Sequence, residues 1–202
     1  MRRVTTVFLT LTVILMMAGP AAAGVLPGEK APDFTLTDTD GQEHHLQAYL
    51  DEGNIVVLEW FNPDCPFIRK HHENHKSMNE TYAPVQGKGV IWLAINSGAK
   101  GKQGAGLERN AKAVKEFEMV FPVLLDENGA VGKQYGAKTT PHMFVITADG
   151  VVAYNGAIDD DRSAAKLGET NHVAVALGEL LAGGKVQTPE TQPYGCSVKY
   201  AK

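Results

Sequence analysis

Cys65 and Cys196 are the only two cysteines in this chain of 202 residues. Cys65 lies between the apolar run 55–61, which is typical of a buried strand, and the stretch 66–82, which predicts a helix. A thiol at a helix N-terminus faces unpaired backbone N–H groups and the positive end of the helix dipole, which favour the thiolate. Pro66 fits the first helical position. We therefore expect Cys65 to be a nucleophile and not a small buried hydrophobe.

Cys196 lies in a tail, flanked by Pro193, Gly195 and Ser197. If Cys65 became a sulfenic acid, a second thiol would condense with it to a disulfide that a reductant reopens. We expect a mobile tail that delivers Cys196 as this resolving thiol. Two alternatives stay open. One is a permanent Cys65–Cys196 staple, which would stabilise the fold by about 4–5 kcal/mol in the chain-entropy model; the other is a free Cys196 that pairs between chains.

Further polar and aromatic side chains close to this thiol in the sequence are candidates for its pocket. Arg69 and Lys70, one turn into the predicted helix, would add positive potential. Glu59 interrupts the predicted buried strand, where a carboxylate near a thiol can take up and release protons. Trp60 or Phe61 would line the pocket.

Three histidines, His71, His72 and His75, follow on the predicted helix. A thiol with a helical histidine can hold copper or zinc, but histidines among lysine, glutamate and asparagine are typical of a solvated face. We therefore expect no metal and no other cofactor. His72, two helical turns after Cys65, would tune the thiol electrostatically, and His142 is a candidate for the pocket rim.

The first residues have the pattern of a secretory signal, with Arg2-Arg3, an apolar run over 7–17 and Ala21-Ala22-Ala23 before Gly24. The apolar run is too short to span a bilayer, and no cysteine follows the cleavage site. We expect a periplasmic or extracellular protein that has no membrane anchor once the signal is removed. An oxidising compartment favours a role for both cysteines.

The net charge is −4, and removal of the signal takes away only two positive charges, which argues against nucleic acid or an anionic membrane as a partner. The length suits a single domain with its own hydrophobic core. We expect a signal peptide over 1–23, one α/β domain over 24–184 and a tail carrying the second cysteine over 185–202.

Alternation and apolar runs predict strands at 33–37, 55–61, 89–95, 121–125, 143–147 and 151–154, and helices at 66–82, 107–119, 130–135 and 171–181. Strands that alternate with helices and finish in a hairpin plus a helix predict three layers. The glycine-rich stretch 97–106 lacks the ending of a phosphate-binding loop and predicts a solvated loop. Asp159-Asp160-Asp161 is expected to cap or precede the last helix.

Two segments carry a family resemblance. The run 60–67, with Cys65-Pro66-Phe67, and the run 136–145, with Thr140-Pro141, resemble the active-site segments of the thioredoxin-like redoxins, the group of alkyl hydroperoxide reductases and thiol-specific antioxidant proteins (AhpC/TSA). The resemblance implies a thioredoxin-like three-layer fold, with a central mixed sheet flanked by helices, an N-terminal strand extension and a C-terminal tail. It also implies a cis Thr140–Pro141 bond beside Cys65.

The chain departs from the patterns of this group at three positions. Ile68 stands where thioredoxins and their exported relatives have a second cysteine, so no local dithiol forms. Leu58 and Asn62 stand where peroxiredoxins have proline and threonine. The candidates for the activating arginine of peroxiredoxins are Arg69, Arg109 and Arg162.

From these observations we predict an exported thiol oxidoreductase that acts through Cys65, with Cys196 as its resolving thiol. Its substrate would be a small-molecule peroxide or a protein disulfide, and a thiol reductant would restore it. The alternative is a thioredoxin-fold binding module for a metal or a partner protein, with a structural Cys65–Cys196 disulfide.

Overall fold

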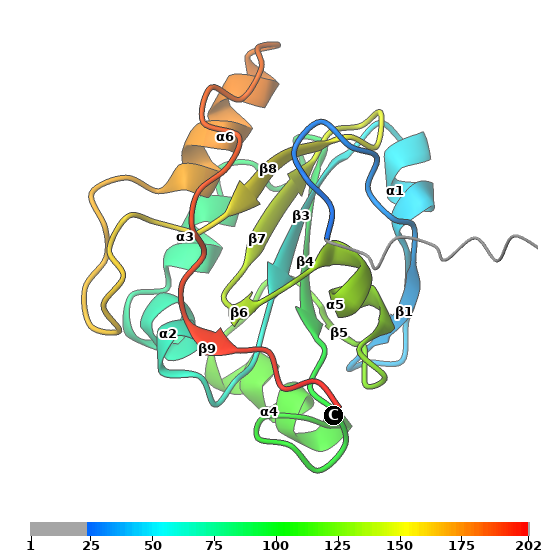
Figure 1. Ribbon diagram of the computed structural model, residues 1–202, viewed down its shortest axis with the longest axis vertical. Helices are drawn as coiled ribbons and strands as arrows, with labels where there is room; N and C mark the ends of the chain where they lie inside the picture. Colours follow the sequence, from blue (N-terminus) through cyan, green and yellow to red (C-terminus); the bar gives the residue numbers. More distant parts are fainter. Residues whose placement is uncertain (1–23, 202) are drawn as a thin grey trace, which may run out of the picture.

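The computed structural model describes residues 24–201, so the predicted signal segment lies outside the described residues. A mixed seven-stranded sheet occupies the centre, in the order β2-β1-β5-β4-β3-β7-β8 (Figure 1). The strands are β1 (Thr35–Asp38), β2 (Glu43–His45), β3 (Ile55–Trp60), β4 (Val90–Asn96), β5 (Val123–Leu125), β7 (Met143–Ile146) and β8 (Val152–Gly156). β3 runs parallel to β4, and β4 to β5, whereas β7 is antiparallel to β3. The central strands are apolar almost throughout because both of their faces are covered.

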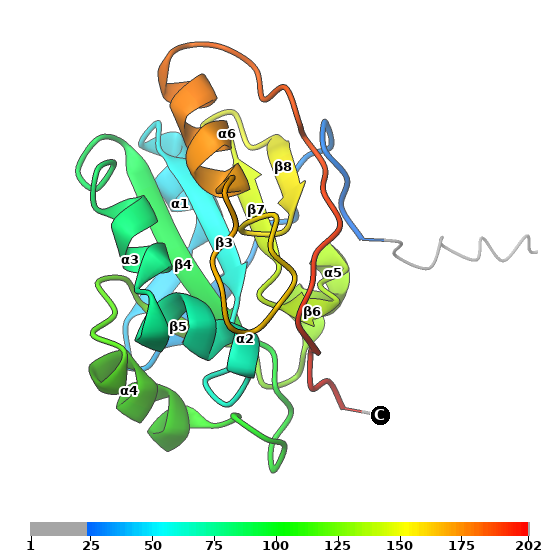
Figure 2. The same ribbon diagram turned by 90° about the vertical axis from the view of Figure 1, so that its left-hand side faces the viewer.

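Helices cover both faces of this sheet. They are α1 (Leu46–Asp51), α2 (Pro66–Arg69), the π-helix η1 (Lys70–Asn74), α3 (Ser77–Tyr82), α4 (Leu107–Glu116), α5 (Ala130–Tyr135) and α6 (His172–Leu181). One hydrophobic core receives side chains from α2, α3, α4 and α6, and the other receives them from α1 and α5. Figure 2 views the molecule from the first of these sides, with α1 behind the sheet. The predicted three-layer α/β fold is confirmed.

The predicted helix over 66–82 is broken into three pieces. α2 passes into η1, and α3 begins only after Lys76, whose φ of 51° is left-handed. Lys70, His71 and His72 are consecutive and all buried. One face of a regular helix does not bury three consecutive side chains, so these depend on segments that cover η1 from outside.

Four short elements lie outside the predicted pattern. They are β2, α1 and a separate two-stranded sheet formed by β6 (Thr139–Thr140) and β9 (Cys196–Ser197). A strand of two residues carries no periodicity, so only its pairing defines it.

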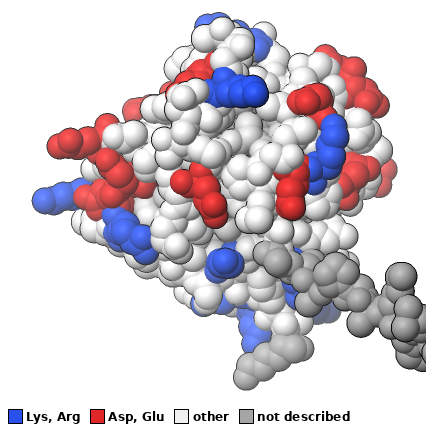
Figure 3. All heavy atoms as spheres, turned by 45° about the horizontal axis from the view of Figure 1, so that its top comes forward, with Lys and Arg blue, Asp and Glu red and all other residues white. Residues whose placement is uncertain are grey.

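The C-terminal segment runs from the end of α6 along the molecule to β6 and then toward α4 (Figure 1). Acidic and basic side chains are interspersed on the face shown in Figure 3. Over residues 24–201, no helix combines the length and the apolar character needed to cross a membrane.

Candidate active site

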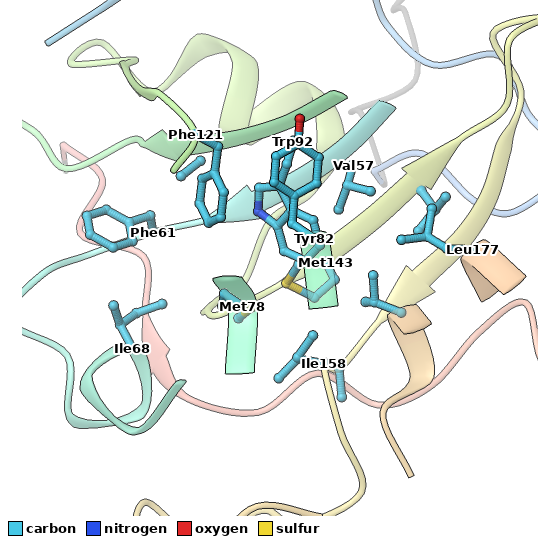
Figure 4. Close-up of a cluster of buried hydrophobic side chains, with 14 of the residues drawn as sticks. Val57, Phe61, Ile68, Met78, Tyr82, Trp92, Phe121, Met143, Ile158 and Leu177 are labelled. Carbon is cyan, nitrogen blue, oxygen red and sulfur yellow. The ribbon is translucent and has the colours of Figure 1, made fainter. Parts of the chain in front are cut away.

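Cys65 lies at the end of the turn that follows β3, as the N-cap residue of α2. Its side chain is only 2% exposed, and its thiol donates to the Thr140 carbonyl at 3.0 Å. The Thr140–Pro141 peptide bond is cis, as the resemblance implied. Cys65 belongs to the same apolar cluster as Phe61 and Ile68, which are labelled in Figure 4. The thiol therefore contacts apolar side chains and has the Thr140 carbonyl as its backbone acceptor.

Cys196 lies beside this thiol. In the β6–β9 pair, Thr140 is the register partner of Cys196, which places the tail strand along the segment that also holds Cys65. Burial, a side-chain hydrogen bond with Cys65 and the charge of Cys65 raise the pKa of Cys196 to about 11. Both cysteines are free thiols in this structure. The tertiary structure thus brings together two cysteines that lie far apart in the sequence.

Gly195 allows this close approach. Its φ is +136°, and a Cβ atom at this position would lie 2.2 Å from the Thr140 oxygen. Only glycine tolerates both the backbone conformation and the short distance. The tail can therefore lie against the same carbonyl that accepts from Cys65.

The turn before Cys65 is held by groups from a distant loop. The Asn62 amide accepts from the Asp64 N–H at 2.9 Å and donates to the Gln103 carbonyl at 3.0 Å. Arg109 contacts the Asp64 carboxylate through Nη2 at 2.8 Å and Nε at 2.9 Å. At Gly104, a Cβ atom would lie 1.9 Å from Asn62 Oδ1.

The loop over 97–106 is therefore not the solvated excursion that its composition predicts, because parts of it are buried against the site. Its Ala99 N–H also donates to the Lys199 carbonyl at 2.9 Å, which joins this loop to the tail.

Glu59 lies deeper in the same core, with no exposed surface. One of its oxygens is 2.7 Å from His72 Nε2, and the other accepts from Trp92 Nε1 at 3.2 Å. The other ring nitrogen of His72 has no hydrogen-bond partner among residues 24–201, and the ring packs edge-on against Phe61 at 5.3 Å. Glu59 is thus bonded to His72 and Trp92 within the core.

Lys70 and His71 bind the tail. The Lys70 ammonium, fully buried, lies 2.7 Å from the Asp161 carbonyl, 3.1 Å from the Tyr194 hydroxyl and 3.4 Å from Asp159. His71 contacts the same tyrosine hydroxyl at 3.0 Å, and burial lowers the pKa of His71 to about 3.

These positions correct two predictions and decide between the alternatives of a third. His71 and His72 do not lie on a solvated face, because the tail and the core cover them. The charge of Lys70 is neutralised by Asp159 and is not free to act on the thiol. Of the two alternatives for the run 159–161, the second holds: it precedes the last helix, and Asn171 caps that helix by accepting from the Ala174 N–H.

Three other candidates lie away from the thiol. Trp60 points to the opposite side of the sheet, into the second core, where it donates to Ser97 at 3.0 Å. Arg69 is half-exposed and pairs with Glu73 at 3.3 Å. His142 is buried and bonded to Asn155 at 2.7 Å, and burial lowers its pKa to about 4.

Sequence reasoning missed Tyr194 and the roles of Asn62 and Arg109 in holding the turn. The residues around Tyr194 and Arg109 in the sequence do not indicate these roles, because each role depends on a contact with a distant segment. Nowhere between residues 24 and 201 does a group of three or more histidine, cysteine, aspartate or glutamate side chains suit a metal ion.

Comparison with known proteins supports a redox site. The family model described as Redoxin matches residues 26–173. The thiol-disulfide oxidoreductase ResA of Geobacillus thermodenitrificans is 33% identical over 128 residues, which cover 63% of this chain and 67% of that protein. Residues 194–197, which hold the tail against Cys65, lie beyond the part that the family model matches.

Two solved structures are similar to this one. A hypothetical protein from Sinorhizobium meliloti 1021 superposes with a TM-score of 0.74 at 28% identity, over 88% of this chain and 96% of that chain. The thioredoxin domain of a thiol-disulfide oxidoreductase from Bacteroides vulgatus superposes with a TM-score of 0.54 at 19% identity, over 65% of this chain and 89% of that chain. The fold is therefore thioredoxin-like.

Proposed function

This chain belongs to the redoxin family, and from that premise we propose that it is a thiol-disulfide oxidoreductase in which Cys65 is the nucleophile and Cys196 the resolving thiol. The observation that carries the proposal is the β6–β9 pairing, which places Cys196 opposite Thr140, the residue whose carbonyl accepts from the Cys65 thiol. Relatives named thiol-disulfide oxidoreductase support the same class of reaction. Ile68 at the position of a local second cysteine explains why the resolving thiol would come from the tail.

In the first step, the Cys65 thiolate attacks one sulfur of a substrate disulfide. A Cys65 mixed disulfide forms, and the other substrate sulfur leaves as a thiolate that takes up a proton. In the second step, the Cys196 thiolate attacks the Cys65 sulfur and expels the remaining substrate thiolate. The substrate gains two electrons, and the two cysteines lose two as they form a disulfide. A thiol reductant then reopens that disulfide by the same exchange.

Formation of the Cys65 mixed disulfide in the first step favours the Cys196 thiolate that is needed in the second step. Cys196 has its raised pKa partly because of the hydrogen bond and the charge of Cys65. Once Cys65 is part of a mixed disulfide it carries no negative charge, so the contribution of that charge to the raised pKa of Cys196 disappears. Cys196 then reaches its reactive thiolate form more readily.

We propose a protein disulfide, and not a peroxide, as the substrate. The hydrogen-bonding groups that would hold a peroxide are engaged elsewhere: Arg109 by Asp64, and the Asn62 amide by the Asp64 N–H and the Gln103 carbonyl. Arg69 faces solvent with Glu73.

A trapping experiment tests the function. Reduced protein is mixed with insulin, quenched in acid, alkylated and examined by mass spectrometry. We expect an internal Cys65–Cys196 disulfide in the wild type, a persistent mixed disulfide with insulin in Cys196→Ser, and no adduct in Cys65→Ser. Absence of both the internal disulfide and the mixed disulfide would refute the proposal.

A stopped-flow experiment tests the choice of substrate. We expect hydrogen peroxide to oxidise the reduced protein no faster than it oxidises free cysteine. A rate clearly higher than that of free cysteine would favour the peroxide as substrate.

We also propose that residues 1–23 direct export and are removed, on the basis of their charged start, apolar run and small residues before Gly24. N-terminal sequencing of the protein recovered from the periplasm should then begin at Gly24. A chain that keeps residues 1–23 would contradict the proposal.

A further inference from the structure

The strand that carries Cys196 is too short to hold itself in place. β9 consists of Cys196–Ser197, opposite Thr139–Thr140, with one further backbone bond from the Val198 N–H to the Lys138 carbonyl. Isolated two-stranded pairs are marginal in water even when they are longer. The position of Cys196 must therefore depend on anchors on either side of β9.

Tyr194, two residues before Cys196, is such an anchor. Its side chain is buried, and its hydroxyl lies in a pocket formed by Lys70, His71 and Asp159. The ring packs edge-on against Phe67 at a centroid distance of 5.8 Å.

The hydrogen bonds of this pocket are complete. A tyrosine hydroxyl has one proton to donate and two lone pairs to accept with. It donates to the Asp159 carboxylate and accepts from the Lys70 ammonium. His71 fills the second lone pair when its Nε2 carries the proton, because its Nδ1 then accepts from Ser77 at 2.8 Å. Bonds to charged partners are the stronger kind, so the hydroxyl is held firmly.

The pocket belongs to the same helical segment that carries the nucleophile. Phe67, Lys70 and His71 all lie in α2 and η1, which begin directly after Cys65. Only Gly195 separates Tyr194 from Cys196, and Gly195 is in close contact with the Thr140 carbonyl that accepts from Cys65. The distance between the two sulfurs is thus linked to Tyr194 through a short, packed segment.

Resting on the proposed Cys65–Cys196 couple, we propose that Tyr194 is a positioning residue for the second step: it holds the tail on the helix of the nucleophile and so raises the effective concentration of Cys196 at Cys65. An intramolecular thiol reacts faster the better its position is defined. The first step, in which Cys65 attacks the substrate, does not need the tail in place.

The test is Tyr194→Phe, which removes the hydroxyl and keeps the ring. Tyr135→Phe is the matched control, because Tyr135 is a buried tyrosine in the opposite core whose hydroxyl donates to the Pro32 carbonyl, away from the tail. We measure the rate at which Cys196 resolves a preformed Cys65 mixed disulfide with glutathione. We expect about a tenfold slower rate in Tyr194→Phe and no change in Tyr135→Phe.

Two further measurements separate positioning from general damage. In a Cys196→Ser background, the attack of Cys65 on glutathione disulfide should not be slower with Tyr194→Phe than without it. The equilibrium constant of the couple in glutathione buffers should fall about tenfold, which corresponds to a potential about 30 mV more positive. Equal slowing of both steps, or no change in either, would overturn the inference.

His71→Asn gives a second variant if Tyr194→Phe does not fold. Asparagine can keep the bond to Ser77 and loses the one to Tyr194, so we expect the same slowing of the second step, to a smaller extent. Unchanged resolution in this variant would also count against the inference. A wild type that never forms the internal disulfide would refute the proposed function itself, whereas an unaffected Tyr194→Phe would refute only the role of Tyr194.

Discussion

The Thr140 carbonyl is the atom at which the two thiol segments meet. Cys65 donates to it at 3.0 Å, and Gly195 passes so close that no side chain fits between them. One backbone oxygen therefore accepts from the Cys65 thiol and also excludes any side chain at position 195 of the tail. The residue that permits this arrangement is Gly195, next to Cys196, and not a polar side chain.

At this scale we predict the effect of Gly195→Ala. The new Cβ would lie 2.2 Å from the Thr140 oxygen, so β9 must leave β6, and resolution by Cys196 should slow at least tenfold. Rapid quench and alkylation of a Cys65 mixed disulfide measures this. Gly183→Ala is the control, since Gly183 also has a positive φ of 77° but nothing within 4 Å of its Cβ position. If both substitutions slowed resolution equally, the slower rate would be due to backbone strain and not to the contact between position 195 and the Thr140 oxygen.

At the scale of elements, the helical segment that begins after Cys65 also holds the C-terminal tail. α2 presents the thiol, and η1 presents two side chains that bind the tail and one that binds Glu59. On the other side of the thiol, the loop over 97–106 supports the turn at Asn62. The site is thus enclosed by three segments, none of which is contiguous with another.

Adjacent charged residues of this segment should differ sharply in their contribution to stability. Lys70→Met leaves Asp159 buried without its cation and should lower the free energy of unfolding by about 3–5 kcal/mol. Arg69→Met removes a half-exposed pair with Glu73 one turn away and should cost about 0.3–0.5 kcal/mol. Urea unfolding of the reduced proteins measures both. Similar losses in the two variants would show that burial does not determine how much these charged residues contribute to the free energy of unfolding.

At the scale of the whole molecule, the two cores lie on opposite faces of one sheet, and each face covers a neutral histidine. Burial lowers the pKa of His71 to about 3 and that of His142 to about 4, from an ordinary value of 6.5. The unfolded chain therefore binds protons that the folded protein does not, so the stability these groups contribute is full above pH 6.5 and is lost as pH falls toward 4 and 3.

We predict acid lability from this difference. Below about pH 6, each of the two histidines should remove about 1.4 kcal/mol of unfolding free energy per pH unit. Urea titrations at pH 7, 6, 5 and 4 measure the slope. His71→Asn should reduce that slope by the contribution of one histidine, about 1.4 kcal/mol per pH unit. An unchanged slope would mean that His71 is protonated in the folded state.

Much of the fold follows from local patterns. The apolar runs at 55–61 and 89–95 predicted the central strands, and Asn171 marked the start of the last helix. Periodicity reports which face of an element is buried, and helix starts depend on a few neighbouring residues, so both can be inferred without the tertiary structure. The helix over 66–82 was wrong because η1 buries polar residues that a local pattern assigns to solvent.

By itself the sequence determined that Cys65 stands at the start of a helix after a buried strand, that no second cysteine is nearby, and that the chain forms three α/β layers. Only the tertiary structure decided that the tail is packed and not free, that Cys196 pairs with Thr140, and that Trp60 faces away from the thiol. The reason is physical. A two-residue strand, a buried lysine and a tyrosine in a polar pocket are stabilised by partners distant in the sequence, and no local preference encodes such contacts.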